Sequence, residues 1–173
     1  MFKELTDIIY HFRRIKARDI ESLWSLIEIL KDEKVNMTFA EIVSKEELLD
    51  YIDNPAELTY VAISEEKPNQ VLSIVKGKRD LSLDRFHAVF LSAATHPQAR
   101  GYGLSPKLTD FALGEMKDEG VSIARIYVYS DNKASINTVK KLDFVHAGSV
   151  LRHHKDLDSG EYVDDLIFHK VLD

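Results

Sequence analysis

The order of strand-like and helix-like segments is the feature that most restricts how this chain can fold. Amphipathic stripes with helical spacing predict helices, which lie at residues 18–32, 44–55, 105–120 and 132–144. β-Prone runs predict strands, which lie at residues 10–17, 58–66, 70–80, 85–97, 121–130, 145–154 and 161–172. Strands joined directly favour antiparallel hairpins, and strands joined through a helix favour parallel neighbours. The order β-α-α-β-β-β-α-β-α-β-β therefore predicts an α/β (α+β) fold with a mixed, mostly antiparallel sheet of about seven strands.

Local signals mark the ends of these segments. Asp19 is the expected N-cap of the first helix, Pro55 ends the second, and Gly120 is the expected stop of the third. The 7 Gly and 4 Pro fall mostly at such boundaries, and the chain has no repeat, low-complexity tract or linker. Its 173 residues match the usual size of one domain. We therefore expect a single domain over residues 1–173.

The composition excludes several classes of function. With 0 Cys, the chain has no disulfide framework, no cysteine-based zinc site and no thiol nucleophile. A net charge of -6 argues against nucleic acid and anionic membranes as general partners. No run of apolar residues is long enough to span a bilayer, and the first 14 residues do not resemble a signal peptide. We therefore expect a cytoplasmic protein.

The segment Gln98-Ala99-Arg100-Gly101-Tyr102-Gly103 carries the strongest signal for function. It lies between an apolar strand and an amphipathic helix, where free N–H groups and the helix dipole favour a negatively charged ligand. Gly101 and Gly103 allow the backbone to approach a ligand closely, and Arg100 adds a positive charge. The spacing is neither a Rossmann fingerprint nor a Walker loop. The segment therefore predicts a phosphate site, with an ordinary glycine turn as the alternative.

With this loop, the chain resembles the GCN5-related N-acetyltransferases, the GNAT family. The stretch "THPQARGYGLSPKL" is similar to the family's acyl-CoA loop, Q/R-x-x-G-x-G/A, with Gln98, Gly101 and Gly103 at the defined positions. Further on, "SDNKASINTVKKLDF" resembles the family's Asn-led helix, which ends in Lys-Leu-Gly-Phe. The resemblance covers nearly the whole chain in element order and about its second half in motifs.

The resemblance implies acetyl-CoA as co-substrate and assigns residues to it. Backbone amides of residues 99–104 would bind the pyrophosphate, and the end of the preceding strand would pair with pantetheine. The strand 124–129 would splay from it and open a slot for the thioester, with Asn132 at its edge. The residues expected to bind the cofactor are Ala93, Ala94, Thr95, Gln98, Ala99, Arg100, Gly101, Tyr102, Gly103, Leu104, Asn132 and Ser135.

The resemblance is weaker for the catalytic groups. Family members often carry a Tyr that protonates the departing thiolate, and this chain has Val139 at that position. Tyr129, Tyr127, Ser135 or a bound water could replace it. The strand 85–97 has only His87 and His96 as titratable candidates for the base, because it contains no Asp or Glu. The predicted catalytic residues are Tyr129, Ser135 and His87, with a structural role as the alternative for each.

The C-terminal region gives a hint about the amine that accepts the acetyl group. It is partly similar to bacterial β-lysine acetyltransferases, which suggests a small amine. Acidic residues there could attract a cationic amine, with an ordinary charged surface as the commoner alternative. They are Asp156, Asp158, Glu161, Asp164 and Asp165. Adjacent residues on a strand point to opposite faces, so His153 and His154 are not expected to share an ion, and no metal is predicted.

The reaction that these features predict is N-acetyl transfer to a primary amine. A neutral amine attacks the thioester directly in a ternary complex, and no covalent nucleophile is required. The small-molecule amine is the expected partner, and the resemblance implies a homodimer. One alternative is an acyl-CoA-binding sensor or regulatory protein that has lost catalysis, since Val139 cannot donate a proton. Another is a phosphate-binding protein unrelated to CoA.

Overall fold

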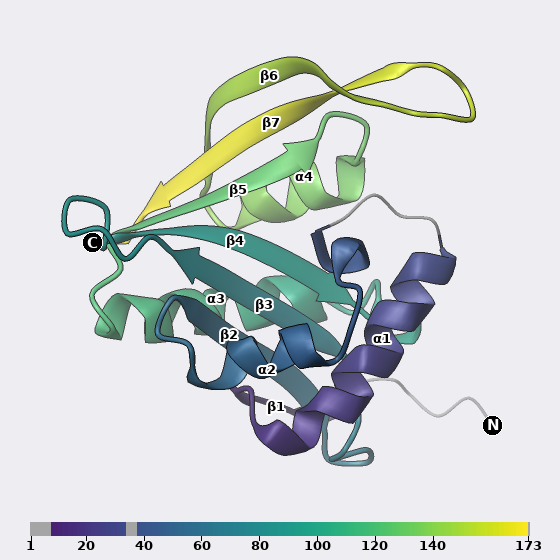
Figure 1. Cartoon of the computed structure of the whole chain (residues 1–173), viewed down its shortest axis with the longest axis vertical. Coiled ribbons are helices and arrows are strands. Elements are labelled where there is room, and N and C mark those ends of the chain that lie inside the picture. Colours follow the sequence, from purple (N-terminus) through teal and green to yellow (C-terminus); the bar gives the residue numbers. More distant parts are fainter. Residues whose placement is uncertain (1–7, 34–37, 173) are drawn as a thin grey trace.

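One seven-stranded sheet forms the frame of the protein in the computed structural model, which describes residues 8–33 and 38–172 (Figure 1). The strands are β1 (Tyr10–Arg14), β2 (Glu57–Ser64), β3 (Ser73–Arg79), β4 (Ala88–Thr95), β5 (Ile123–Tyr129), β6 (Val145–Lys155) and β7 (Tyr162–Val171). Their order across the sheet is β1-β2-β3-β4-β5-β7-β6. The β4–β5 pair is parallel and the other neighbours are antiparallel. The predicted mixed, mostly antiparallel sheet is therefore confirmed.

Helices cover both faces of the sheet (Figure 1). They are α1 (Ile20–Asp32), α2 (Glu46–Asp53), α3 (Leu104–Asp118) and α4 (Lys133–Lys141), with short 3-10 turns η2 (Ala17–Asp19), η3 (Thr38–Glu41) and η4 (Pro97–Ala99). The predicted element order is confirmed. The predicted domain limits, residues 1 and 173, lie outside the described residues.

Two apolar clusters hold these layers together. Leu108 and Met116 of α3 pack with Val139 of α4 against one face of the sheet. Leu23 and Leu30 of α1 belong to the cluster on the other face. Burial of these side chains is the main stabilising term for the fold. Side chains alternate between the two faces along a strand. A strand residue that belongs to one of these clusters therefore identifies the face on which it and its second neighbours lie.

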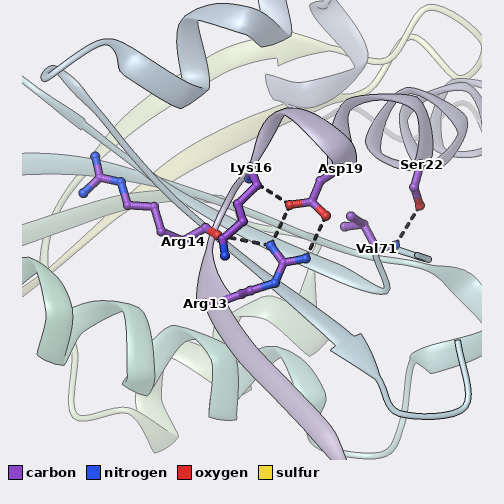
Figure 2. A network of polar contacts seen from close by, with 6 residues as sticks. All are labelled: Arg13, Arg14, Lys16, Asp19, Ser22 and Val71. Atoms are coloured by element: carbon purple, nitrogen blue, oxygen red, sulfur yellow. Dashed lines mark hydrogen bonds and ion pairs between the residues drawn. The ribbon is translucent and has the colours of Figure 1, made fainter. Parts of the chain in front are cut away.

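Asp19 occupies the N-cap position of α1, as predicted, but its side chain makes no capping hydrogen bond. The turn η2 lies between β1 and α1 and directs the Asp19 carboxylate back towards β1 (Figure 2). There it accepts hydrogen bonds from the Arg13 guanidinium at 2.6 and 2.8 Å and from the Lys16 amide at 2.8 Å. Nearby, the Val71 amide donates to Ser22 Oγ at 2.7 Å and ties α1 to the segment before β3. The β1–α1 corner is therefore held by a buried ion pair.

Candidate functional site

The strands β4 and β5 separate towards their C-terminal ends. Their parallel pairing runs from Ala88 opposite Ile123 to Leu91 opposite Ile126 and ends there. Beyond that point β4 continues along β3, and β5 continues along β7 as far as Tyr129. The splay expected for residues 124–129 is therefore present, and an opening in the hydrogen-bonded ladder lies between residues 92–95 and 127–129.

Backbone groups of β4 face this opening. The His96 amide donates to the Leu72 carbonyl at 2.8 Å, and the Ala94 carbonyl accepts from Ser73 Oγ at 3.0 Å, so these residues direct their backbone groups towards β3. Backbone direction alternates along a strand. Ala93 and Thr95 therefore direct their peptide groups towards the opening, where an extended ligand could pair with them.

The loop after β4 offers a run of free amides. Gly101 and Gly103 have φ values of 83° and 70°, which favour glycine. These turns point the N–H groups of residues 101–105 away from the chain, and they have no acceptor among the residues that the structure describes. A Cβ at either glycine would meet nothing within 4 Å. An anion therefore has both donors and space at the N-terminus of α3.

The other loop residues anchor this arrangement. Ala99 and Leu104 are buried in the core, whereas Tyr102 is exposed. The Gln98 amide donates to His96 Nδ1 at 3.2 Å. Burial, followed by the charges of Lys67 and Arg100, lowers the pKa of His96, so its ring is neutral and can accept this bond. His96 therefore shapes the turn.

Arg100 has partners within the protein. Its guanidinium donates to both carboxylate oxygens of Glu33, at 3.1 and 2.7 Å, and its Nε donates to the Thr95 carbonyl at 3.1 Å. Glu33 follows α1, so this pair ties the loop to α1. The structure places the positive charge of Arg100 beside the loop, already neutralised by a carboxylate.

Asn132 and Ser135 lie together at the start of α4. The Asn132 side chain caps this helix by accepting from the Ser135 amide at 3.0 Å. Val139, one helical turn further, is buried in the core. The predicted Asn132 and Ser135 thus lie just after the end of β5, beside the opening, and Val139 contributes packing.

The structure separates His87 from the other predicted catalytic residues. His87 is exposed and precedes the start of β4, and its carbonyl accepts from the Ser122 and Ile123 amides. It lies at the opposite end of β4 from the opening, so the structure does not bring it together with Tyr129 and Ser135. Sequence proximity to β4 was misleading because the strand is eight residues long, about 26 Å from end to end.

Tyr129 ends β5 at the border of the opening. Its hydroxyl has no hydrogen-bond partner within the part of the chain that the structure describes. Burial, followed by the negative charges of Asp165, Glu41 and Asp131, raises the pKa of Tyr129. The phenol is therefore protonated at neutral pH and can donate a proton.

The two adjacent histidines of β6 share one carboxylate. Asp165 Oδ2 lies 2.6 Å from His153 Nδ1, and Asp165 Oδ1 lies 3.1 Å from His154 Nε2. The expectation that alternation keeps the two rings apart is wrong. The β6–β7 register shifts between Val150 and His154, and Arg152 has a φ of 54°, so a bulge breaks the alternation. Sequence reasoning missed this cluster because neither the bulge nor its φ is visible in residue types.

Comparison with known proteins decides the family. A sequence profile described as the acetyltransferase (GNAT) family matches residues 23–144. The chain belongs to the GNAT family. It is thus an acetyl-CoA-dependent N-acetyltransferase, and the matched region contains the loop, the opening and the whole of α4. A search of curated proteins finds no match.

Solved GNAT structures share this fold at low sequence identity. A GNAT acetyltransferase from Streptococcus pneumoniae has a TM-score of 0.81 and 18% identity, covering 94% of this chain and 99% of that one. A ribosomal-protein-alanine N-acetyltransferase from Brucella melitensis has a TM-score of 0.80 and 19% identity, covering 93% and 99%. YncA from Salmonella typhimurium, solved with acetyl-CoA, has a TM-score of 0.80 and 19% identity, covering 95% and 94%.

These comparisons leave finer expectations open. They do not test the partial similarity to β-lysine acetyltransferases, which stays a prediction. Among the helices that the structure describes, none is both long and apolar enough to cross a membrane.

Proposed function

We propose that this GNAT enzyme acetylates a primary amine, with a small cationic amine or amino acid as the favoured acceptor, by direct attack in a ternary complex. The observation that carries the proposal is the run of amides at residues 101–105 beside the opening between β4 and β5. Amides that can bind an anion lie at one end of this opening, and peptide groups of Ala93 and Thr95 on β4 face it. This arrangement suits a long ligand with an anionic head.

The donor side of the site is built from backbone. Amides at the N-terminus of α3 would hold the pyrophosphate of acetyl-CoA, which supplies the activated acetyl group. Peptide groups of Ala93 and Thr95 would pair with the pantetheine arm. Asn132 and Ser135 would border it from α4. Because the Arg100 guanidinium is held by Glu33, we infer that Arg100 supports the loop instead of supplying a free charge to the phosphates.

The acceptor side carries negative charge. Tyr129 and its cross-strand partner Asp165 share one face of the sheet, and Glu41 of η3 acts on Tyr129 from the same region. Carboxylates near the opening would attract a protonated amine. We infer that Tyr129 protonates the departing thiolate in place of the usual Tyr, since Val139 is apolar and buried.

The experiment is a thiol-release assay with acetyl-CoA and a panel of primary amines: an α-amino acid, a diamine, a polyamine, an aminoglycoside and an alanine-ended peptide. The absence of Cys removes background from protein thiols. We expect release with at least one amine, and a kcat about 100-fold lower for Tyr129→Phe, with Tyr162→Phe as the control. Acetyl-CoA binding without release for every amine supports the sensor or regulatory alternative. The cytoplasmic location and the homodimer stay predictions.

A further inference from the structure

The His153, His154 and Asp165 side chains form a cluster beside the opening, and the mechanism so far does not use it. Their potential ligand atoms all lie within 4.8 Å of one another. We propose that His154 is the general base that takes the proton from the acceptor ammonium, and that Asp165 positions its ring. This inference rests on the proposed function, because it assumes that the acceptor is an amine.

The cluster is on the correct side of the sheet. Asp165 lies directly across from Tyr129 in the β5–β7 register, and cross-strand partners share a face. Ala124 and Val128 point into the core with α3, so alternation places Tyr129 on the other face. The His154 ring contacts the Tyr129 ring edge-on, with their centroids 4.5 Å apart. His154 therefore stands beside the last residue that borders the opening.

Asp165 is suited to support a protonated imidazole. Asp165 is only 5% exposed. Its Oδ1 atom is buried and receives no hydrogen bond from any described residue. His154 Nε2 lies 3.1 Å from that oxygen. A buried carboxylate oxygen without a donor is unfavourable, and an imidazolium at this distance compensates it. Proton uptake at His154 Nδ1 therefore turns the contact between Nε2 and Asp165 Oδ1 into a charged pair.

His154 is favoured over its neighbour as the base. The His153 side chain is 54% exposed and already uses Nδ1 in the 2.6 Å contact with Asp165. His154 is less exposed, at 35%, and its Nδ1 has no partner among the described residues. The His153 ring lies beside that of His154 with their centroids 4.7 Å apart, and Glu41 and Asp131 act on the neighbouring Tyr129.

A metal ion is the competing reading of these donors. Structural zinc sites have four protein ligands, and catalytic ones have three with an open position. The described residues supply three, and the shortest contact between them is a direct hydrogen bond from His153 to Asp165. The contacts are those of a proton-bound pair, which favours a base over a metal site.

His154 Nδ1 takes one proton from the ammonium, and the neutral nitrogen attacks the acetyl carbon. The C–N bond forms, and the C–S bond breaks with its electron pair leaving on sulfur. The second nitrogen proton ends on sulfur by way of Tyr129 or water, and His154 returns its proton to solvent. The products are the N-acetylamine, CoA thiol and one proton.

The test compares His154→Gln and Asp165→Asn with His11→Gln. His11 is an exposed histidine that contacts Glu65 at 3.2 Å on β1, the opposite edge of the sheet. With the best amine of the panel, we expect kcat/KM to fall about 100- to 1000-fold for His154→Gln. We also expect this variant to lose the acidic limb of the pH profile, which is the fall in kcat/KM at low pH that protonation of the base causes in the wild type. Asp165→Asn keeps this limb, because His154 is still present, and lowers kcat/KM through loss of the carboxylate that positions the ring. His11→Gln retains wild-type kinetics.

Two readouts besides turnover complete the design. Calorimetry with acetyl-CoA should give the wild-type Kd for both variants, because neither residue touches the α3 loop. Carbethoxylation of His154 by diethyl pyrocarbonate, mapped by mass spectrometry, should slow when the amine is present, while that of His11 should not.

The outcomes separate the two proposals. If no amine is acetylated although acetyl-CoA binds, the proposed function fails and the base fails with it. If the wild type is active and His154→Gln keeps both its rate and its acidic limb, the inference alone is overturned. A large loss for His153→Gln, or activity abolished by a chelator and restored by zinc, also overturns it, in favour of the other ring or of a metal.

Discussion

Gly101→Glu and Gly103→Glu each lose acetyl-CoA affinity by at least about 100-fold. A side chain at either position would project into the open space beside the free amides, where no protein atom lies within 4 Å of the new Cβ. Its carboxylate would also repel the pyrophosphate that those amides are proposed to hold. Calorimetric titration with acetyl-CoA measures the loss, and a 100-fold change corresponds to about 2.7 kcal/mol.

Gly120→Glu is the matched control for this prediction. Gly120 has a φ of 85° and equally open surroundings, but it lies at the other end of α3. A side chain in this backbone region destabilises by about 1–2 kcal/mol at all three positions, so strain cancels in the comparison. Retained affinity in the Gly101 and Gly103 variants, or an equal loss in Gly120→Glu, would refute the loop assignment.

Asp19→Ala destabilises the protein by about 3 kcal/mol. The Arg13 side chain is only 18% exposed beside Asp19, so the variant keeps a largely buried charge without its partner. Breaking a buried pair on one side costs about 3–5 kcal/mol. For a chain of this size the midpoint Tm falls by about 10 °C. Thermal unfolding followed by circular dichroism measures this. Asp110→Ala, an exposed change on α3, should stay within about 0.5 kcal/mol of wild type.

The same pair makes stability depend on pH. Burial alone raises the pKa of Asp19, but the hydrogen bonds from Arg13 and the Lys16 amide outweigh it and lower that pKa below its ordinary 3.8. The stabilisation is therefore fully present above pH of about 4 and is lost as pH falls through the lowered value. Asp19→Ala should lack this part of the acid dependence. Equal Tm values for wild type and variant at pH 7 would contradict the role given to the pair.

The sequence predicts the donor side of the site better than the acceptor side. The loop at residues 98–103 is local, because two glycines between a strand and a helix specify their own backbone shape. The splay of β5 was expected only through the family resemblance. The structure places His87 away from the opening, because position along a strand decides which end of the sheet a residue occupies, and residue type does not report this.

Long-range geometry explains the remaining differences. Asp19 was expected to act on the helix that follows it, but its partner Arg13 comes from the preceding strand. Arg100 was expected to face a ligand, but Glu33, far away in sequence, holds it. The contact of both histidines with Asp165 depends on a bulge at Arg152. Each of these depends on a pairing partner that local patterns do not reveal.

Calorimetric titration of the folded protein with acetyl-CoA, with ATP and NADH as controls, tests the central claim most directly. The account predicts selective binding of acetyl-CoA with a Kd in the micromolar range, because both the phosphate donors and the strand opening are needed to hold it. No binding of acetyl-CoA or longer acyl-CoAs, or equal binding of ATP, would contradict the assignment of the α3 loop and the β4–β5 opening as the donor site.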